Sequence, residues 1–214
     1  MTADFRALIN ENPPAFSEAE FQPAPWPEDA GRFFSGKLTE DCAEVDLSRV
    51  RYTRDSRFRG FSWREVLESS ELDEVLVELS ENPGYYVSGG LKIPAPEYVS
   101  LDRGTSWAVE DGLKRTVAGR FFLVKSGYPP VLYGVRRILY IPDEALERLW
   151  PELTAYYPTL CHSGYNVEAV RHTMERVRED WHPGFTLDGG TLDRAAVLAL
   201  PRTPTTKSRW EFWR

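Results

Sequence analysis

Residues 111–116, with the sequence DGLKRT, carry the side chains of this chain best suited to chemistry. Gly112 lets the backbone turn sharply, and a helix that begins just after the turn points its free N–H groups and positive dipole end outward. Lys114 and Arg115 add full positive charges there, and arginine can hold a phosphate through two parallel hydrogen bonds. Thr116 can cap the helix or donate to a phosphate oxygen. The spacing therefore predicts a phosphate site formed by Gly112, Lys114, Arg115 and Thr116.

Two carboxylates, those of Glu110 and Asp111, stand directly before this cationic stretch. Carboxylates beside a phosphate can hold Mg²⁺ or act as a general base. We therefore expect Asp111, Arg115 and Glu110 to be the catalytic residues of a phosphate-directed reaction, with Mg²⁺ held through Asp111. The alternative is a purely structural stretch, in which Gly112 is a simple turn, Thr116 is an N-cap, and the two cations face solvent.

Local patterns predict the elements that position these residues. Residues 97–101 and 106–109 are expected to form a hairpin, because 102–105, with the sequence DRGT, is a favourable turn. A helix over 116–124 and a strand over 130–141 should follow it. The predicted phosphate site then lies between the hairpin and the helix.

The rest of the chain alternates between predicted strands and helices. Ser62 and Glu65 have the spacing of a capping box, which predicts a helix start. The other predicted elements are a strand over 44–50, a helix over 70–79, a strand that begins at 85–87, helices over 143–150 and 166–180, and a helix or strand over 192–200.

The order of hairpin, Asp-Gly turn, basic pair, helix and strand resembles the ParB/sulfiredoxin superfamily, whose members share a G-x-x-R motif between a strand and a helix. The resemblance covers residues 44–141 and implies an α/β (α+β) fold, a mixed sheet with flanking helices. It also implies an ATPase and/or DNase that acts on nucleotide or DNA phosphate, with ATP or another nucleotide as ligand. Leu113 stands where sulfiredoxins have a catalytic Cys and chromosome-partitioning ParB proteins a Glu, so reduction of a cysteine sulfinic acid is not expected.

Residues 142–214 contain no recognisable helix-turn-helix module of the ParB kind, and the long aromatic-rich arms resemble those of plasmid fertility-inhibition factors of the oncogenic suppressive activity family. This resemblance implies a cytoplasmic bacterial protein that blocks DNA transfer by a conjugative or type IV secretion system. Its partners would be DNA or a nucleotide, and a secretion component at the inner membrane face or that system's protein substrate. The alternative function is a non-catalytic DNA- or protein-binding inhibitor or adaptor with a degenerate ParB-like fold.

Charge and composition narrow the functional classes. The net charge is −7, and an acidic protein as a whole binds nucleic acid poorly. Arginines nevertheless gather in one stretch, where Arg54, Arg57 and Arg59 are the DNA-binding candidates. Cys42 and Cys161 are expected to be reduced thiols, and their spacing to the three histidines fits no zinc pattern, so no metal is expected on His or Cys. No run of about 18 apolar residues is present, so no membrane span is expected.

Three regions are expected within one compact unit: an irregular arm over 1–43, the ParB/sulfiredoxin-like core over 44–141, and a helical extension with a tail over 142–214. Prolines and aromatic residues fill the arm, which predicts a segment that has no long helix and packs on the core. The tail ends in the sequence WEFWR. Its aromatic side chains can stack on single-stranded bases or dock on protein.

Overall fold

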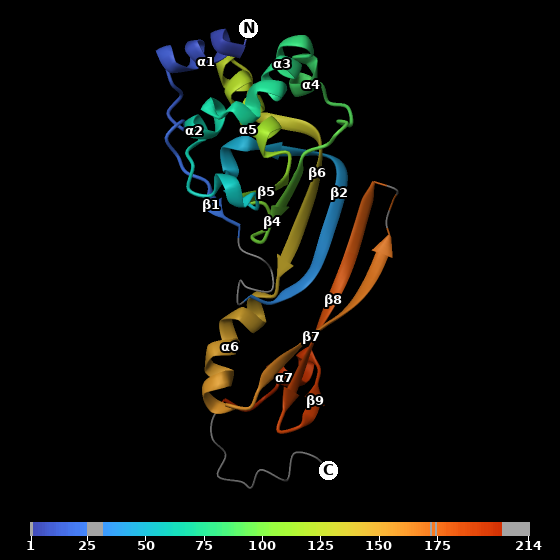
Figure 1. Ribbon diagram of the computed structural model, residues 1–214. Coiled ribbons are helices and arrows are strands. Elements are labelled where there is room, and N and C mark those ends of the chain that lie inside the picture. The colour runs from blue at the N-terminus through green and yellow to red at the C-terminus, as the bar shows by residue number, and fades with distance from the viewer. Residues whose placement is uncertain (1, 25–31, 172, 174, 203–214) are drawn as a thin grey trace.

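The computed structural model describes residues 2–24, 32–171, 173 and 175–202. These residues form one mixed sheet that runs along the molecule, with helices beside it (Figure 1). The predicted α/β class, with a mixed sheet and flanking helices, is confirmed. The strands are β1 Gln22–Pro23, β2 Phe34–Asp46, β3 Val50–Thr53, β4 Glu97–Ser100, β5 Trp107–Asp111, β6 Val131–Pro142, β7 Cys161–Arg171, β8 Arg176–Leu187 and β9 Gly190–Leu192.

The strands lie in the order β1-β3-β5-β4-β6-β2-β8-β7, and β9 pairs with β8. The pairs β1–β3, β3–β5 and β4–β6 are parallel, and the remaining pairs are antiparallel. The β2–β6 pair extends from Phe34 opposite Pro142 to Asp46 opposite Val131. These two long strands therefore connect the two ends of the sheet.

Helices gather at both ends of this sheet. They are α1 Thr2–Glu11, α2 Trp63–Glu68, α3 Asp73–Glu81, α4 Gly84–Val87, α5 Leu113–Lys125, α6 Glu144–Tyr156 and α7 Arg194–Leu198. Helices α1 to α5 lie together at one end, whereas α6 and α7 lie with β9 at the other end (Figure 1).

Two separate hydrophobic clusters explain this arrangement. The larger cluster joins α1, α2, α3 and α5 to the strands at their end of the sheet, and defines what we call the N-terminal lobe. The smaller cluster joins Phe33 to α6, α7 and β8, and defines the C-terminal lobe. The rings of Phe34, Tyr140, Trp181 and Tyr165 pack in a row beside this second cluster, with neighbouring centroids 5.0 to 5.5 Å apart. Aromatic packing of this kind stabilises the junction between the lobes.

Several local predictions are confirmed. Ser62 and Glu65 form the reciprocal capping box at the start of α2. The hairpin of β4 and β5 is present, and α3, α5 and β6 lie within three residues of their predicted ranges. Helix α6 begins one residue from its predicted start and extends six residues beyond its predicted end. The strand predicted over 44–50 is interrupted, since β2 ends at Asp46, a 3₁₀ turn follows, and β3 begins at Val50.

The arm is only partly as predicted. Its aromatic side chains do pack on the core: Phe21 is fully buried, and Phe16 contacts the rings of Trp63 and Phe121. However, α1 is a regular helix of ten residues, because the prolines that prevent helix formation begin only after it. The expected boundary at 43/44 falls inside β2.

Two predicted elements are wrong. The segment that begins at Tyr85 is the short helix α4, because Tyr86 is buried against Gly119 of α5. The predicted helix over 166–180 is a hairpin of β7 and β8, and β8 pairs on its other side with β2. The valines that suggested a helical face are in part exposed, Val167 at 47% and Val170 at 37%. The pairing of β8 with the distant strand β2 favours a strand here. The spacing of apolar residues along 166–180 does not reveal that pairing.

Among the described helices, none is long and apolar enough to cross a membrane.

Candidate functional site

Gly112 forms the turn that the sequence predicted. It is the N-cap of α5, with φ of 81° and ψ of 29°, a conformation that favours glycine. A Cβ at this position would lie 3.0 Å from Cβ and 3.1 Å from Cα of Pro96. The close approach that Gly112 permits is therefore made by Pro96 of the same chain.

The N-terminal end of α5 has no side-chain cap. The N–H of Gly112 donates to Oδ1 of Asp111 at 2.7 Å, and the helical hydrogen bonds begin with the N–H of Thr116, which donates to the carbonyl of Gly112 at 2.9 Å. The N–H groups of residues 113–115 therefore have no acceptor within the helix. This end of α5 keeps the positive partial charge that favours an anion.

The two cations of the predicted phosphate site already have partners. Lys114 pairs with Glu71 at 3.0 Å, and Arg115 pairs with Glu78 of α3 at 3.0 Å. The carboxylates are partly exposed, and such pairs contribute little to stability because water screens them. They balance the charge of the helix start, and a phosphate would have to compete with them.

Thr116 has neither of its predicted roles. It is the fourth residue of α5 and is fully buried. Its hydroxyl lies 2.7 Å from the Tyr98 hydroxyl and donates to the carbonyl of Gly112 at 3.0 Å. The hydroxyl is thus enclosed in the core and cannot reach a phosphate. Burial also raises the pKa of Tyr98, which keeps its hydroxyl neutral inside the core.

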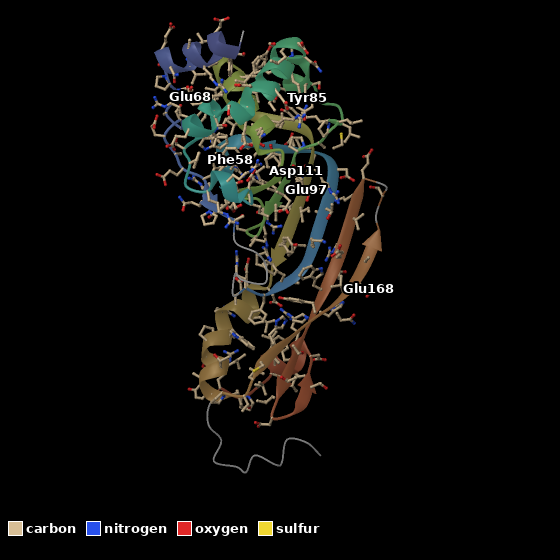
Figure 2. The ribbon with its side chains drawn as sticks, viewed as in Figure 1. Phe58, Glu68, Tyr85, Glu97, Asp111 and Glu168 are labelled. Atoms are coloured by element: carbon tan, nitrogen blue, oxygen red, sulfur yellow. The ribbon has the colours of Figure 1, made fainter. Side chains whose placement is uncertain are left out.

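The two predicted catalytic carboxylates lie in different surroundings. Glu110 pairs with Arg54 at 2.5 Å. Asp111 is exposed and lies opposite Glu97 of β4 in the sheet register (Figure 2). Burial raises the pKa of Glu97, and the neighbouring carboxylates of Glu110 and Asp111 raise it further, against the lowering effect of Arg136. The result is a patch with surplus negative charge beside Asp111.

Two of the predicted catalytic residues, Arg115 and Asp111, line two different cavities. Arg115 lines a cavity of about 240 Å³ together with Tyr85, whose hydroxyl donates to the carbonyl of Pro94 at 2.8 Å. Asp111 lines a second cavity, of about 490 Å³, with Glu97 and Arg136. Ile93 and Pro94 line both cavities. The structure therefore brings Asp111 and Arg115 to the two sides of one loop.

The arginines predicted to bind DNA are largely neutralised. Arg57 pairs with Asp55 at 2.6 Å and with Glu71 at 2.8 Å, and its hydrogen bond to Asp55 is the main cause of the lowered pKa of that carboxyl. Arg54 is paired with Glu110, as described above. Arg59 is exposed and makes no ion pair with a described residue. Two of the three predicted DNA-binding arginines are thus engaged by carboxylates, and Arg59 is left exposed.

Sequence reasoning missed the loop over residues 88–95 and the residues around it. Lys92 is buried to 97%, and its ammonium group donates to the carbonyls of Tyr85 and Ser88. Gly134 of β6 has φ of 67°, and a Cβ there would lie 1.8 Å from the carbonyl oxygen of Gly90. The signals in the sequence were a lysine and a glycine in ordinary contexts, and neither marks such a long-range contact.

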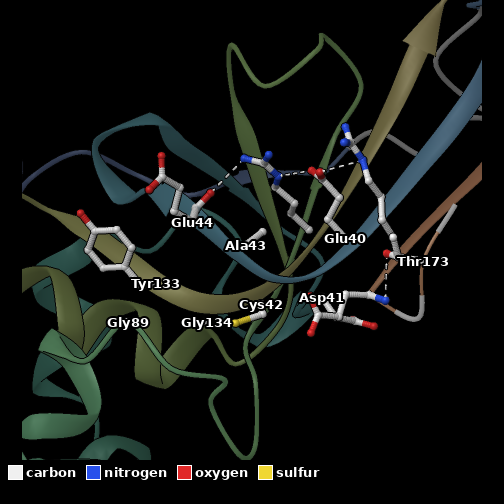
Figure 3. Close-up of a pocket in the computed structure, with 12 residues that line it drawn as sticks. Glu40, Asp41, Cys42, Ala43, Glu44, Gly89, Tyr133, Gly134 and Thr173 are labelled. Carbon is white, nitrogen blue, oxygen red and sulfur yellow. Dashed lines mark hydrogen bonds and ion pairs between the residues drawn. The ribbon is translucent and has the colours of Figure 1, made fainter.

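A further cavity of about 440 Å³ lies beside this loop, at the bulge of β2 (Figure 3). In it, Glu40 pairs with Arg137 at 2.6 Å and with Arg176 at 3.1 Å. Cys42 lies at the bulge with φ of 57°, and it and Cys161 are exposed free thiols. Among the described residues no group of three or more His, Cys, Asp or Glu side chains is placed to hold a metal ion. His172 and the aromatic tail lie outside the described residues.

Comparisons with known proteins add no relative: no family model, no curated protein and no solved structure matches this chain.

Proposed function

We propose that the protein binds a phosphate group of a nucleotide or of DNA at the N-terminal end of α5 and acts on it as a hydrolase, an ATPase and/or a DNase. The observation that supports this proposal is the uncapped end of α5, where free N–H groups stand beside Lys114 and Arg115. An anion there gains hydrogen bonds and the helix dipole together. A role in fertility inhibition, by interference with conjugative or type IV DNA transfer, belongs to the same proposal.

The chemistry would use the residues on both sides of the loop. Arg115 would exchange Glu78 for phosphate, because the fork of a guanidinium matches two phosphate oxygens. Asp111, the exposed carboxylate, would hold Mg²⁺ or act as a base for the attacking water. Glu110 is the less suitable base, because Arg54 holds its carboxylate.

Calorimetric titration of the full chain with Mg-ATP tests the binding step. Arg115→Ala should weaken affinity by about 10- to 150-fold, the equivalent of about 1.5–3 kcal/mol for a charged hydrogen bond. Lys114→Ala should cost less, because lysine is a flexible point charge. Glu78→Gln is the matched control: it frees Arg115 of its partner and should strengthen binding. Equal affinity of the wild type and Arg115→Ala would contradict the proposal.

Hydrolysis is tested separately with ATP and with plasmid DNA. Asp111→Asn should abolish turnover while Arg115-dependent binding persists, since the amide can neither bind Mg²⁺ strongly nor accept a proton. Turnover that survives Asp111→Asn would exclude this carboxylate from the reaction.

A second function is a non-catalytic inhibitor or adaptor that binds protein or DNA. The observation that favours it is that Glu71 and Glu78 already occupy Lys114 and Arg115, while Ile93 on the neighbouring loop is 85% exposed. Inhibition of conjugation in a donor strain distinguishes the two functions. An adaptor should lose inhibition with Ile93→Asp and keep it with Arg115→Ala, and the hydrolase should show the opposite pattern.

A further inference from the structure

The cavity beside Asp111 is a groove with one apolar wall and one acidic wall. We call it the acidic groove. Its volume is about 490 Å³, and it is lined by Asp41, Cys42, Leu91, Lys92, Ile93, Pro94, Ala95, Glu97, Asp111, Arg136 and Glu175. Its parts come from the β2 bulge, the loop over 88–95, the ends of β4 and β5, β6, and the turn before β8.

Hydrogen bonds hold the loop that carries the apolar wall. Leu91 and Ile93 are 59% and 85% exposed, yet Lys92 between them is buried and donates through its backbone N–H to the carbonyl of Gly134 at 3.0 Å. The hydrogen bond from Tyr85 to Pro94 fixes the far end of the loop. Two large apolar side chains exposed on one short loop offer a contact for the apolar part of a ligand.

The acidic wall has more negative charge than the chain itself neutralises. Four carboxylates and two cations line the groove, which gives 2 − 4 = −2. Arg136 is shared between Asp41 at 3.6 Å and Glu97 at 3.4 Å. Asp111 and Glu175 make no ion pair with any described residue. The groove therefore fits a ligand that is both cationic and apolar.

Residues 203–214 of this chain have that chemistry. Lys207, Arg209 and Arg214 against Glu211 give 3 − 1 = +2. Trp210, Phe212 and Trp213 supply three large rings. Tryptophan and arginine are the residues that most often dominate protein interfaces.

The lengths of the two segments favour a tail from another molecule. Glu175 lines the groove and directly precedes β8, whose last residue, Leu187, belongs to the same hydrophobic cluster of the C-terminal lobe as Leu200. Twelve residues of β8 at roughly 3.3 Å each span about 40 Å. From Leu200, the ten residues to Trp210 reach at most about 36 Å when fully extended, and the thirteen residues to Trp213 reach at most about 47 Å. Of its two tryptophans, a chain's own tail could therefore bring only Trp213 to its own groove, and only with the chain almost fully extended.

We propose that residues 203–214 of a second copy of this chain dock in the acidic groove, with aromatic rings against Leu91 and Ile93 and basic side chains toward Asp111 and Glu175. Exchange of both tails gives a closed dimer with two equivalent contacts. The docking shares Asp111 with the proposed hydrolysis but uses neither Lys114 nor Arg115. Loss of phosphate binding in Arg115→Ala and loss of docking in Ile93→Asp are therefore measured separately.

Sedimentation of two full-length variants tests it. Ile93→Asp places a charge on the apolar wall, and the double variant Trp210→Ala/Trp213→Ala removes the rings. We expect the wild type to be dimeric and each variant to weaken the dimer at least tenfold. A mixture of the two variants should form heterodimers, because one supplies the intact tail and the other the intact groove. Val77→Asp, at an exposed apolar residue of α3, is the matched control and should leave the dimer unchanged.

A synthetic peptide of residues 203–214 provides the second measurement. In excess it should dissociate the wild-type dimer, and it should bind Ile93→Asp at least tenfold more weakly than Val77→Asp. The proposal is overturned by a wild type that stays monomeric at all concentrations, by dimers that resist both variants, or by peptide binding that does not depend on Ile93.

Discussion

The start of α5 and the acidic groove lie on two sides of one loop, and they differ in how their charges are balanced. The helix start is built from consecutive residues, and its two cations are matched by Glu71 and Glu78. The groove is assembled from distant segments, and two of its carboxylates have no ion pair among the described residues. A motif that is conspicuous in the sequence can thus be satisfied internally, while the unbalanced charge accumulates where no local pattern indicates it.

The acidic groove depends on Gly134 more strongly than the start of α5 depends on Gly112. Replacement of Gly134 should therefore have the largest effect on stability. Gly134→Ala places a Cβ 1.8 Å from the Gly90 carbonyl oxygen at a φ that disfavours side chains. We expect a loss of about 3 kcal/mol or more in the free energy of unfolding, with displacement of the loop over 88–95. Urea denaturation measures the loss.

Substitutions at Gly112 and Gly60 provide a comparison for the loss of stability in Gly134→Ala. Gly112→Ala meets Pro96 at 3.0 Å and should cost about 1–3 kcal/mol, whereas Gly60→Ala has the same sign of φ but no atom within 4 Å and should cost about 1–2 kcal/mol. If Gly134→Ala costs no more than Gly60→Ala, the loop yields easily and the groove is not rigid.

Thr116→Val tests whether Thr116 at the start of α5 contributes to stability alone or also to phosphate binding. It removes the hydroxyl that pairs with Tyr98 in the core. An unpaired buried hydroxyl costs about 1–3 kcal/mol, so the midpoint of unfolding should fall. Affinity for Mg-ATP should stay at the wild-type value, because Thr116 cannot reach the ligand. A loss of affinity in a folded protein would restore Thr116 to the phosphate site.

Glu97→Gln tests the surplus negative charge of the groove through its pH dependence. Burial raises the pKa of Glu97 above 4.5 in the folded state, so ionisation of this group costs stability at neutral pH. The variant should be more stable than the wild type at pH 7, by up to about 1 kcal/mol. That advantage should disappear as the pH falls below about 4.5, where the carboxyl is protonated in both states.

Asp143 in the C-terminal lobe provides the opposite control. Burial disfavours its charge, but hydrogen bonds from Arg194 and from the start of α6 outweigh burial and lower its pKa. Asp143→Asn should therefore destabilise the protein at neutral pH, and its effect should fade in acid as the wild-type carboxyl is protonated. Thermal unfolding from pH 3 to 8 compares both variants, and effects of equal sign would contradict the charge assignment.

Arg59→Ala should have the smallest effect. Arg59 is exposed and has no ion pair among the described residues, so stability should change by no more than about 0.5 kcal/mol. DNA binding, measured by fluorescence anisotropy at two salt concentrations, should also change little, because its neighbours Arg54 and Arg57 are already paired. A large loss of DNA affinity would show that this stretch, and not α5, contacts DNA.

The sequence by itself determined the elements that depend on near neighbours. The capping box at Ser62, the hairpin of β4 and β5, the turn at Gly112 and the helix after it follow from hydrogen bonds and backbone preferences within a few residues. For the same reason the helix start that carries the proposed phosphate site could be located from residues 111–116.

Only the tertiary structure decided which contacts those elements make. It paired β8 with β2, which turned the predicted helix over 166–180 into strands, and it buried Thr116 against Tyr98. It also placed Glu78 on Arg115 and the loop over 88–95 on Gly134. Each of these contacts joins residues far apart in the chain or on different elements, and its free energy depends on packing and desolvation that local periodicity does not encode.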